Sequence, residues 1–429
     1  MKKELIIEIQ QVNPWLQGSG QVIFESADYF SRLQMSVLSQ SEWDSLALIL
    51  VGPRQAGKTT LGKHISRQII QEGRFNQLLY LNCDLPLIRE WIRGIAFLTD
   101  IQKHLNLKEY ILFIDEVQRL ENPGLLLKAI IDLKLPIKLI ASGSSQLEMK
   151  SAVQEYLTGR HVEGLILPLS WEELGDYSDS ETRMIYGCYP QIVTHSKKEW
   201  LLEQLCYTYI KKDIIEILRV SKADVMEKLV TLLAHSSGQL VNYQQLAVDC
   251  QVSIPTIQHY ISILEQTYVI QIIRPFVGNK RQEMTSNPIC YFVDNGFRNQ
   301  SLHNFNLLTQ RTDAGLLVEN TVFQELFKFK AQHFKSFKIH YWRTKGGAEV
   351  DFVLYQNDDT LIPVEVKYVN FSEFKLTRGY RSFIETYQPK VGFMITKNFY
   401  AKEKIGNCQL YCFPLTDLKQ MLLQLQDLL

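Results

Sequence analysis

The segment GPRQAGKTT at residues 52–60 constrains this chain most, because it directly follows the apolar run 46–51. Glycines at this spacing, followed by Lys-Thr, are typical of a phosphate-binding loop between a strand and a helix. The loop turns its backbone N–H groups inward, and the positive end of the next helix points at the same place. We therefore expect a nucleoside triphosphate here, with Lys58 on the phosphates and the Thr59 hydroxyl on Mg²⁺. The residues expected to hold the nucleotide are Gly52, Pro53, Arg54, Gln55, Ala56, Gly57, Lys58, Thr59 and Thr60.

A second feature supports the same site: the apolar residues 110–114 run into Asp115 and Glu116. In P-loop NTPases an acid at this place supports Mg²⁺, and a following Glu orients the attacking water. A third apolar segment, residues 137–141, ends in hydroxyl residues, and parallel strands converge at one sheet edge. Ser144 is the preferred sensor of the γ-phosphate, while the alternative is a buried strand that ends in a Ser/Gly turn.

The length, composition, net charge and cysteine content limit the classes of protein to which this chain can belong. A chain of 429 residues predicts two to four domains, and 46% hydrophobic residues suffice for a large core. A formal net charge of zero gives no global field to attract nucleic acid, so any DNA contact requires a local patch. The seven cysteines form no CxxC pair, which argues against zinc and suits a reducing compartment. The charged N-terminus and the lack of a bilayer-length apolar run predict a cytoplasmic protein without a membrane partner.

Residues 1–45 are predicted to form an N-terminal helical segment, and residues 46–196 a P-loop domain in which strands and helices alternate. This alternation indicates a parallel sheet. The predicted strands are 46–51, 78–82, 110–115, 137–142 and 163–168, and the predicted helices include 58–72 and 123–134.

Residues 197–285 are predicted to form a helical lid with a winged helix-turn-helix. Two helical patterns meet at Ser253, an N-cap residue, and an alternating strand follows. However, no Lys or Arg occurs between residues 240 and 273, and phosphate contacts dominate DNA affinity. A scaffold or lid role is therefore favoured over DNA reading by this helix. Arg274, Lys280 and Arg281 are the better candidates for backbone contact.

Residues 286–429 are predicted to be α/β again, with a helix at 318–327 and strands at 339–343, 348–355 and 361–368. Strand side chains alternate between two faces. The expected groups are Glu349, Asp351 and Val353 on one face, Val350, Phe352 and Leu354 on the other, and Glu365 with Lys367 on a shared face.

Buried carboxylates on adjacent strands are costly unless they are compensated. We expect Asp351 and Glu365 to bind Mg²⁺ or Mn²⁺, with Glu319 from the helix as a further ligand. Lys367 would orient or deprotonate a water and stabilise charge on a phosphate. Asp followed by Glu-x-Lys is the spacing of restriction-endonuclease-like nucleases. The alternative is a surface hairpin with an Asp351–Lys367 salt bridge.

Together these motifs resemble prokaryotic AAA-type, archaeal-ATPase-like P-loop ATPases over nearly the whole chain. The later motifs resemble the C-terminal domain of unknown function in those ATPases, which is similar to PD-(D/E)xK nucleases. The resemblance implies adenine over guanine and makes Arg160 a candidate arginine finger or phosphate sensor, in cis or in trans. It also places Pro190 near the adenine, although Cys188 replaces a glycine of that turn.

We therefore expect an α/β protein that binds and hydrolyses ATP with Mg²⁺, coupled to a nuclease-like domain that acts on DNA. The alternatives are an ATP-dependent switch whose inactive nuclease-like module binds protein partners, or a winged-helix DNA-binding regulator. A homo-oligomer also remains an option.

Overall fold

The computed structural model describes residues 2–17, 29–143, 156–210, 214, 223–276, 287–357 and 360–429. The chain divides into two compact units, residues 1–168 and 169–429. The helical middle region and the C-terminal α/β region both lie in the second unit. The division at residue 168 also precedes the expected boundary at 196, and the finer four-part division stays a prediction. Within the described ranges, every helix is too short or too polar to traverse a lipid bilayer.

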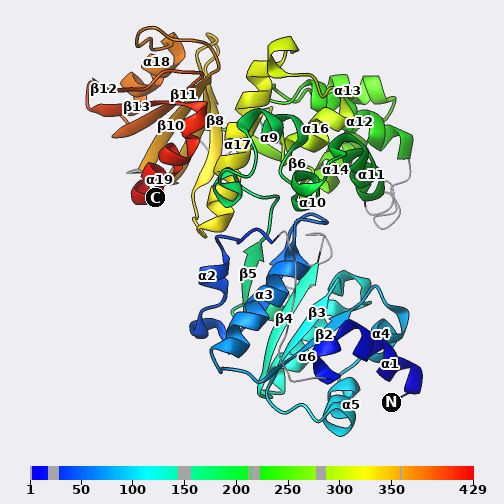
Figure 1. Ribbon diagram of the computed structural model, residues 1–429. Coiled ribbons are helices and arrows are strands. Elements are labelled where there is room, and N and C mark those ends of the chain that lie inside the picture. The colour runs from blue at the N-terminus through cyan, green and yellow to red at the C-terminus, as the bar shows by residue number, and fades with distance from the viewer. Residues whose placement is uncertain are drawn as a thin grey trace. The chain divides into compact units, whose positions relative to one another are not determined.

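A five-stranded parallel sheet in the order β2-β3-β4-β1-β5 organises the first unit (Figure 1). The parallel sheet expected from the sequence is therefore confirmed. The fifth strand was expected at residues 163–168 but covers 161–165. Its five residues pair one by one with the five residues of β1, which sets both of its ends. The strands are β1 (Ala47–Val51), β2 (Gln77–Asn82), β3 (Tyr110–Asp115), β4 (Ile137–Gly143) and β5 (His161–Leu165).

Both faces of this sheet are covered, since all five residues of β1 are buried. Leu48 and Leu50 pack into one apolar cluster, and Ile49 and Val51 pack into another, as the two-residue repeat of a strand requires. The helices of the unit are α1 (Lys3–Val12), α2 (Met35–Leu38), α3 (Lys58–Gln71), α4 (Pro86–Trp91), α5 (Ala96–Leu105) and α6 (Pro123–Asp132).

The N-terminal residues protect the outer edge of β2, which is an end strand of the sheet. Asn13 Nδ2 donates to the Tyr80 carbonyl oxygen at 2.8 Å, and the Tyr80 N–H donates to Asn13 Oδ1 at 2.6 Å. Trp15 Nε1 donates to the Leu78 carbonyl oxygen at 2.7 Å. These side chains occupy backbone groups that an exposed edge strand leaves open for aggregation. The N-terminal segment is thus part of the first unit.

An eight-stranded mixed sheet in the order β12-β13-β11-β10-β9-β8-β6-β7 organises the second unit. The antiparallel hairpin β6–β7 joins this sheet because β6 pairs with β8, so the expected boundary at residues 285 and 286 separates two strands of one sheet. The strands are β6 (Ile270–Pro275), β7 (Ile289–Phe292), β8 (Lys338–Arg343), β9 (Glu349–Asn357), β10 (Thr360–Lys367), β11 (Val391–Thr396), β12 (Ala401–Ile405) and β13 (Cys408–Pro414).

Several helices of the second unit begin at a residue whose side chain accepts one of the first N–H groups, which lack partners within the helix. Ser253 Oγ accepts the Thr256 N–H at the helix expected after a tight turn. Ser170 and Glu173 form a capping box at the start of α8. The helices are α8 (Trp171–Leu174), α9 (Ser180–Tyr186), α10 (Pro190–Thr194), α11 (Lys198–Tyr207), α12 (Ala223–His235), α13 (Tyr243–Cys250), α14 (Ile254–Gln266), α16 (Asn295–Ser301), α17 (Ala314–Gln332), α18 (Arg378–Tyr387) and α19 (Leu418–Leu428).

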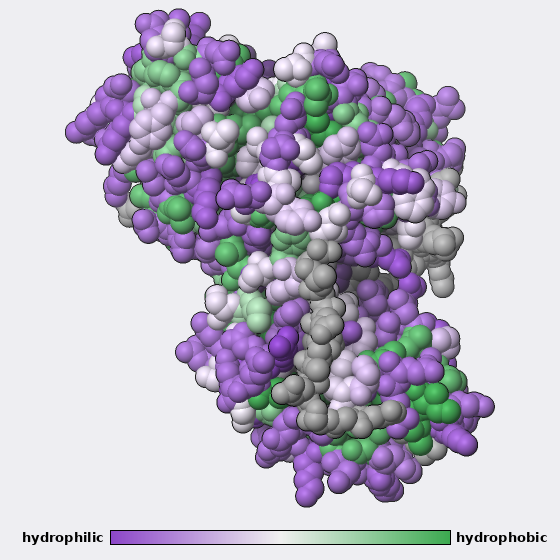
Figure 2. Space-filling model, viewed as in Figure 1, coloured by the Kyte–Doolittle hydropathy of each residue, from purple (hydrophilic) through white to green (hydrophobic). Residues whose placement is uncertain are grey.

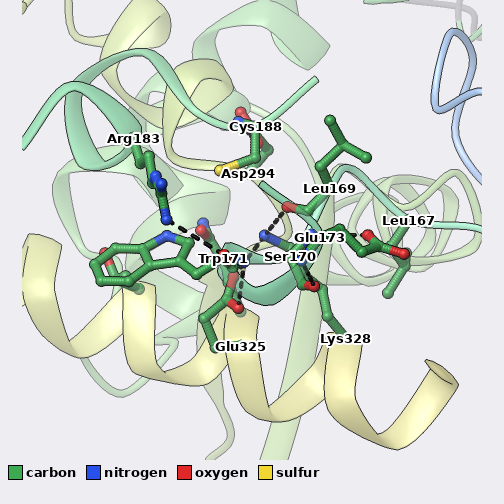
Figure 3. A network of polar contacts seen from close by, with 12 residues as sticks. Leu167, Leu169, Ser170, Trp171, Glu173, Arg183, Cys188, Asp294, Glu325 and Lys328 are labelled. Carbon is green, nitrogen blue, oxygen red and sulfur yellow. Dashed lines mark hydrogen bonds and ion pairs between the residues drawn. The ribbon is translucent and has the colours of Figure 1, made fainter. Parts of the chain in front are cut away.

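Buried polar contacts hold the first residues of the second unit against α17 (Figure 3). Glu325 and Lys328 on this helix form a 2.9 Å ion pair, and both side chains are 1% exposed. The Trp171 N–H donates to Glu325 Oε2 at 2.9 Å, and Lys328 Nζ donates to the Leu169 carbonyl oxygen at 3.0 Å. Each buried charge therefore has an ion-pair partner and a backbone partner, as burial in a low-dielectric interior demands.

Buried hydrophobic residues form the cores of both units. Figure 2 shows a face on which hydrophilic residues predominate and hydrophobic residues form small patches. All seven cysteines are buried and reduced. Burial is the main cause that raises the pKa of the Cys188 thiol to about 12, so the thiol stays neutral.

Candidate functional site

The loop after β1 has the backbone that its glycines permit. Gly52 and Gly57 have φ angles of 144° and 97°, and Gln55 between them has φ 59°. A Cβ atom on Gly52 would lie 2.0 Å from the Ile166 carbonyl oxygen, so no side chain fits there. The residue type is therefore dictated by both torsion and space.

Lys58 is the first residue of α3 and is 5% exposed. Its Nζ donates to the carbonyl oxygens of Gly52 at 3.0 Å and Pro53 at 2.8 Å, so the amino group lies over the loop. The helix has 14 residues and directs its free N–H groups at the same loop. A cation and a helix N-terminus that meet at a glycine loop provide a site for phosphate.

Asp115 ends β3 and faces this loop. Its Oδ2 accepts hydrogen bonds from Thr59 Oγ1 and from the Tyr80 hydroxyl, each at 2.8 Å. Its Oδ1 accepts from the Ser142 hydroxyl and, at 3.2 Å, from the Glu116 N–H. The structure thus brings together the two predicted Mg²⁺ ligands, Thr59 and Asp115, as hard oxygen donors suited to that ion.

Glu116 follows directly in a left-handed conformation, with φ 55°. Burial chiefly raises the pKa of its carboxyl group and the neighbouring Asp115 charge raises it further, while Lys58 and a hydrogen bond from Gln118 Nε2 oppose the rise. A carboxyl group with a raised pKa, beside a phosphate loop, has the electrostatics that a general base needs.

Two contributors were not assigned a role by the sequence analysis. Ser142 lies at the end of β4, and Tyr80 lies on β2, and both hydroxyls donate to Asp115. Lys63 Nζ lies 4.1 Å from the centroid of the Tyr80 ring. The sequence signal for Ser142 was its place at the end of a strand beside β3. The sequence pattern instead favoured Ser144, which lies outside the described residues.

Arg160 lies beside the amino end of β1, whereas the phosphate loop lies at the carboxyl end of that strand. Its carbonyl oxygen accepts the N–H of Ala47, the first residue of β1. Its guanidinium pairs with Asp132. A role on the nucleotide of its own chain does not fit this position. Pro190 begins α10 in the second unit and is not among the residues that the first unit gathers.

A second cluster lies in the second unit, on β9 and β10. Asp351 Oδ2 accepts the Val366 N–H at 2.7 Å. Glu365 is 1% exposed, and its Oε1 accepts from Lys367 Nζ at 3.1 Å and from Thr377 Oγ1 at 3.2 Å. Its Oε2 is buried without a hydrogen-bond partner. Such an atom in a native fold calls for a ligand or a proton.

Glu319 on α17 completes this acidic cluster. Burial chiefly raises the pKa of Glu319 to about 8, with a contribution from the Asp351 charge. Burial likewise raises the pKa of Glu365 to about 8, again with help from Asp351. Lys367 opposes both rises. The four predicted residues of the second site are therefore near enough to perturb one another.

The donor set limits which ion fits. The part of the chain that the structure describes contains no group of three or more His, Cys, Asp or Glu side chains arranged around a metal position. Asp351 and the free Oε2 of Glu365 suit a divalent cation that keeps several waters, as Mg²⁺ does. Glu319 instead accepts a 2.6 Å hydrogen bond from the Tyr291 hydroxyl.

One expected strand face is wrong. Phe352 and Leu354 pack in the cluster beside α17, but Val350 packs with Val353 in the cluster around Trp342. The pairing of β8 with β9 shifts register between His340 and Trp342, and such a bulge breaks the alternation of faces.

Three segments of the chain match family models. Residues 44–175 match the AAA domain, and residues 177–308 and 314–417 match two domains of unknown function, DUF8612 and DUF4143. Residues 44–175 are therefore similar to the AAA domain, as the motifs predicted. The match at residues 314–417 confirms the expected C-terminal domain of unknown function. It does not test the expected similarity of that domain to nucleases.

The chain is similar to three uncharacterized proteins. Those of Mycobacterium bovis and Mycobacterium tuberculosis are each 24% identical over 309 residues, 71% of this chain and 66% of their own length. That of Haemophilus influenzae is 23% identical over 335 residues, 73% of this chain and 80% of its own length. The chain thus spans just under two thirds of the two mycobacterial relatives.

Similar solved structures include PCH-2 of C. elegans, with a TM-score of 0.24, 16% identity, and coverage of 54% of this chain and 65% of that chain. AMPPCP-bound DnaA from Aquifex aeolicus also has a TM-score of 0.24, with 14% identity and coverage of 54% and 85%. These scores are too low to carry the assignment, which rests on the family model.

Proposed function

We propose that the first unit binds ATP with Mg²⁺ at the phosphate loop and hydrolyses it. The observation that carries this proposal is the 2.8 Å hydrogen bond between Thr59 Oγ1 and Asp115 Oδ2. It joins the first turn of the loop helix to the acid at the end of β3. The AAA-domain match supports adenosine as the nucleoside.

Each side chain has a distinct role in this proposal. Lys58 balances the charge of the β- and γ-phosphates, and the loop N–H groups orient them. Thr59 and Asp115 hold the cation, which when bound neutralises charge that develops on the phosphates. Glu116 orients water and accepts its proton. Tyr80 and Ser142 fix the Asp115 carboxylate in place through their hydroxyl groups.

ATP binding by the full chain tests this assignment. Lys58→Ala should weaken binding at least about tenfold, because a charge-assisted contact contributes about 1.5–3 kcal/mol. Lys103→Ala is the matched control, since Lys103 is exposed on α5. Equal affinity of Lys58→Ala and the parent protein would remove the site.

A second candidate function is metal-dependent cleavage of DNA by the second unit. It is favoured by the meeting of Asp351, Glu365 and Lys367, and by the unsatisfied Oε2 of Glu365. A bound Mg²⁺ or Mn²⁺ would act as a Lewis acid on a phosphate. Lys367 would stabilise negative charge, while Thr377 orients Glu365.

Cleavage of plasmid DNA with Mn²⁺ tests this second function. The parent protein should cut, and Asp351→Asn should not cut but should keep its ATPase activity. If the parent does not cut, the acidic cluster serves instead as an inactive module that binds protein partners, and capture of such a partner should then depend on Glu365.

The helices α13 and α14 with the hairpin β6–β7 form the basis of the winged-helix proposal. The exposed residues at the start of α14 include Ile254, Gln258 and His259, none of which carries a permanent positive charge. We therefore assign this element to coupling between ATP turnover and the second unit rather than to DNA reading. Duplex-DNA binding by the full chain that falls steeply with salt and is lost in Gln258→Glu would contradict this role.

A further inference from the structure

A pocket of about 420 Å³ lies between β6, β8 and α17, within the second unit. Arg274 comes from β6, Lys338 and His340 from β8, and Lys330 from α17. Three strongly basic residues from three elements thus line one cavity. Its size falls in the range of sites that hold small organic ligands.

The two lysines of this pocket lack acidic partners. Neither Lys330 nor Lys338 forms an ion pair with any described carboxylate. Burial chiefly lowers the pKa of Lys330, and the charge of Lys338 lowers it further. The charges of Lys330 and Lys338 repel each other, and a bound anion would offset that repulsion.

An aromatic wall faces the same cavity. Phe327 is half-buried, and its ring stacks on Phe323 at 5.9 Å between centroids and 12° between planes. Phe323 in turn stacks on Tyr291 at 4.7 Å and 14°. Phe327 therefore ends this row of three rings, and because it lines the cavity, a planar ligand ring there could stack on it.

This pocket is separate from the acidic cluster. Glu319 and Lys330 are 11 residues apart on α17, which is about 16 Å along the axis of a helix. His340 Nδ1 lies 3.2 Å from the Arg274 carbonyl oxygen, so this contact fixes one side of the pocket. The lining of the cavity thus combines basic residues with the aromatic residues Phe323 and Phe327.

We propose that this pocket binds a nucleotide unit, with its phosphate between Lys330 and Lys338 and its base on Phe327. The nucleotide is either a free mononucleotide or one unit of a single nucleic-acid strand, since both present the same phosphate and ring. The proposal is independent of ATP hydrolysis and of DNA cleavage.

Binding to the full chain carrying Lys58→Ala tests the pocket, because this background disables the phosphate loop. The probes are inorganic phosphate, AMP and a single-stranded oligothymidylate of about six residues. Lys330→Ala/Lys338→Ala should weaken AMP or oligonucleotide binding by about tenfold to a hundredfold. Lys103→Ala/Lys345→Ala removes the same net charge from exposed positions and should bind as before.

Phe327→Leu separates the two parts of the ligand. It should weaken AMP or oligonucleotide binding and leave phosphate binding unchanged, because only the ring stacks. AMP binding identifies a free nucleotide as the ligand, and oligonucleotide binding without AMP binding identifies a strand.

A charge-preserving variant guards against misfolding. Lys330→Arg/Lys338→Arg should keep binding, and its affinity should fall with salt as steeply as that of the parent. Parental affinity of Lys330→Ala/Lys338→Ala, equal loss in both double-alanine variants, or no binding of AMP and oligonucleotide by the parent would overturn the proposal.

Discussion

Thr59 Oγ1 donates a hydrogen bond of 2.8 Å to Asp115 Oδ2, although 56 residues separate the two in the chain. The contact joins the first turn of α3 to the carboxyl end of β3, two strands away from β1 in the sheet. The loop that supplies the lysine and the strand that supplies the acid therefore form one site. A hydroxyl and a carboxylate at this distance provide both protein oxygens expected around Mg²⁺.

Removing the charge of Asp115 should separate cation binding from nucleotide binding. Asp115→Asn keeps an oxygen that accepts from Thr59 but loses the negative charge. We expect the affinity for ATP with Mg²⁺ to fall about tenfold to a hundredfold, the range found for groups that support a metal. The affinity for ATP without a divalent ion should not fall. Titration with and without Mg²⁺ measures both, and an equal fall in the two would contradict the role.

The steric demand at Gly52 predicts a large effect of one methyl group. Gly52→Ala would set a Cβ atom 2.0 Å from the Ile166 carbonyl oxygen, so the loop or β5 must shift. We expect a loss of about 1–3 kcal/mol in the free energy of unfolding, together with weaker ATP binding. Gly73→Ala is the control, because Gly73 also has positive φ but no atom within 4 Å of the added methyl. Chemical denaturation that ranks Gly73→Ala as the worse variant would refute this explanation.

The ion pair between Glu325 and Lys328 should be costly to break. Both side chains are 1% exposed, so Glu325→Gln leaves a buried ammonium group without its counter-charge. We expect a loss of about 3–5 kcal/mol from the second unit. The exposed pair Lys375–Glu373, at 3.2 Å, is the comparison, and Glu373→Gln should cost at most about 1 kcal/mol. Similar denaturation midpoints for the two variants would show that the buried pair does not stabilise the unit.

The lowered pKa of Asp313 leads us to expect that the stability of the second unit depends on pH. Burial would raise the pKa of Asp313, but hydrogen bonds and charge from Arg311 and Arg298 outweigh it and lower the pKa to about 2. A carboxyl group whose pKa is depressed on folding stabilises the fold above its unfolded pKa, near pH 4, and loses this effect as the pH falls towards 2. Asp313→Asn should therefore be less stable than the parent at pH 6, and the difference should shrink below pH 4. A difference that grows on acidification would contradict the sign.

Local patterns predicted the phosphate loop and β3 well, because both depend on residues close together in the sequence. The strand β3 has the predicted bounds, Tyr110–Asp115, since its apolar run is ended by a carboxylate. The strand β5 runs from His161 to Leu165 because these residues pair with β1 along its whole length, and a pairing between strands is not visible in the sequence of either one. Tyr80 was missed because its place beside Asp115 depends on the pairing of Asn82 with Asp115, a register between two strands.

For the acidic cluster too, local sequence patterns predicted what depends on one strand and missed what depends on contacts between elements. Alternation along β10 correctly placed Glu365 and Lys367 on one face, where they pair at 3.1 Å. On β9 the alternation failed at Val350, because a register shift with β8 is a property of the pair of strands and not of either sequence. The contact between Tyr291 and Glu319 joins a strand and a helix, so no local pattern marks it.

Steady-state phosphate release from ATP by the parent protein and by Glu116→Gln, at saturating Mg²⁺ and ATP, measures whether the first unit hydrolyses ATP with Glu116 as its general base. Both proteins should bind ATP equally well, and turnover by Glu116→Gln should fall at least about a hundredfold, as loss of a general base implies. Equal turnover by the two proteins would contradict this role of Glu116.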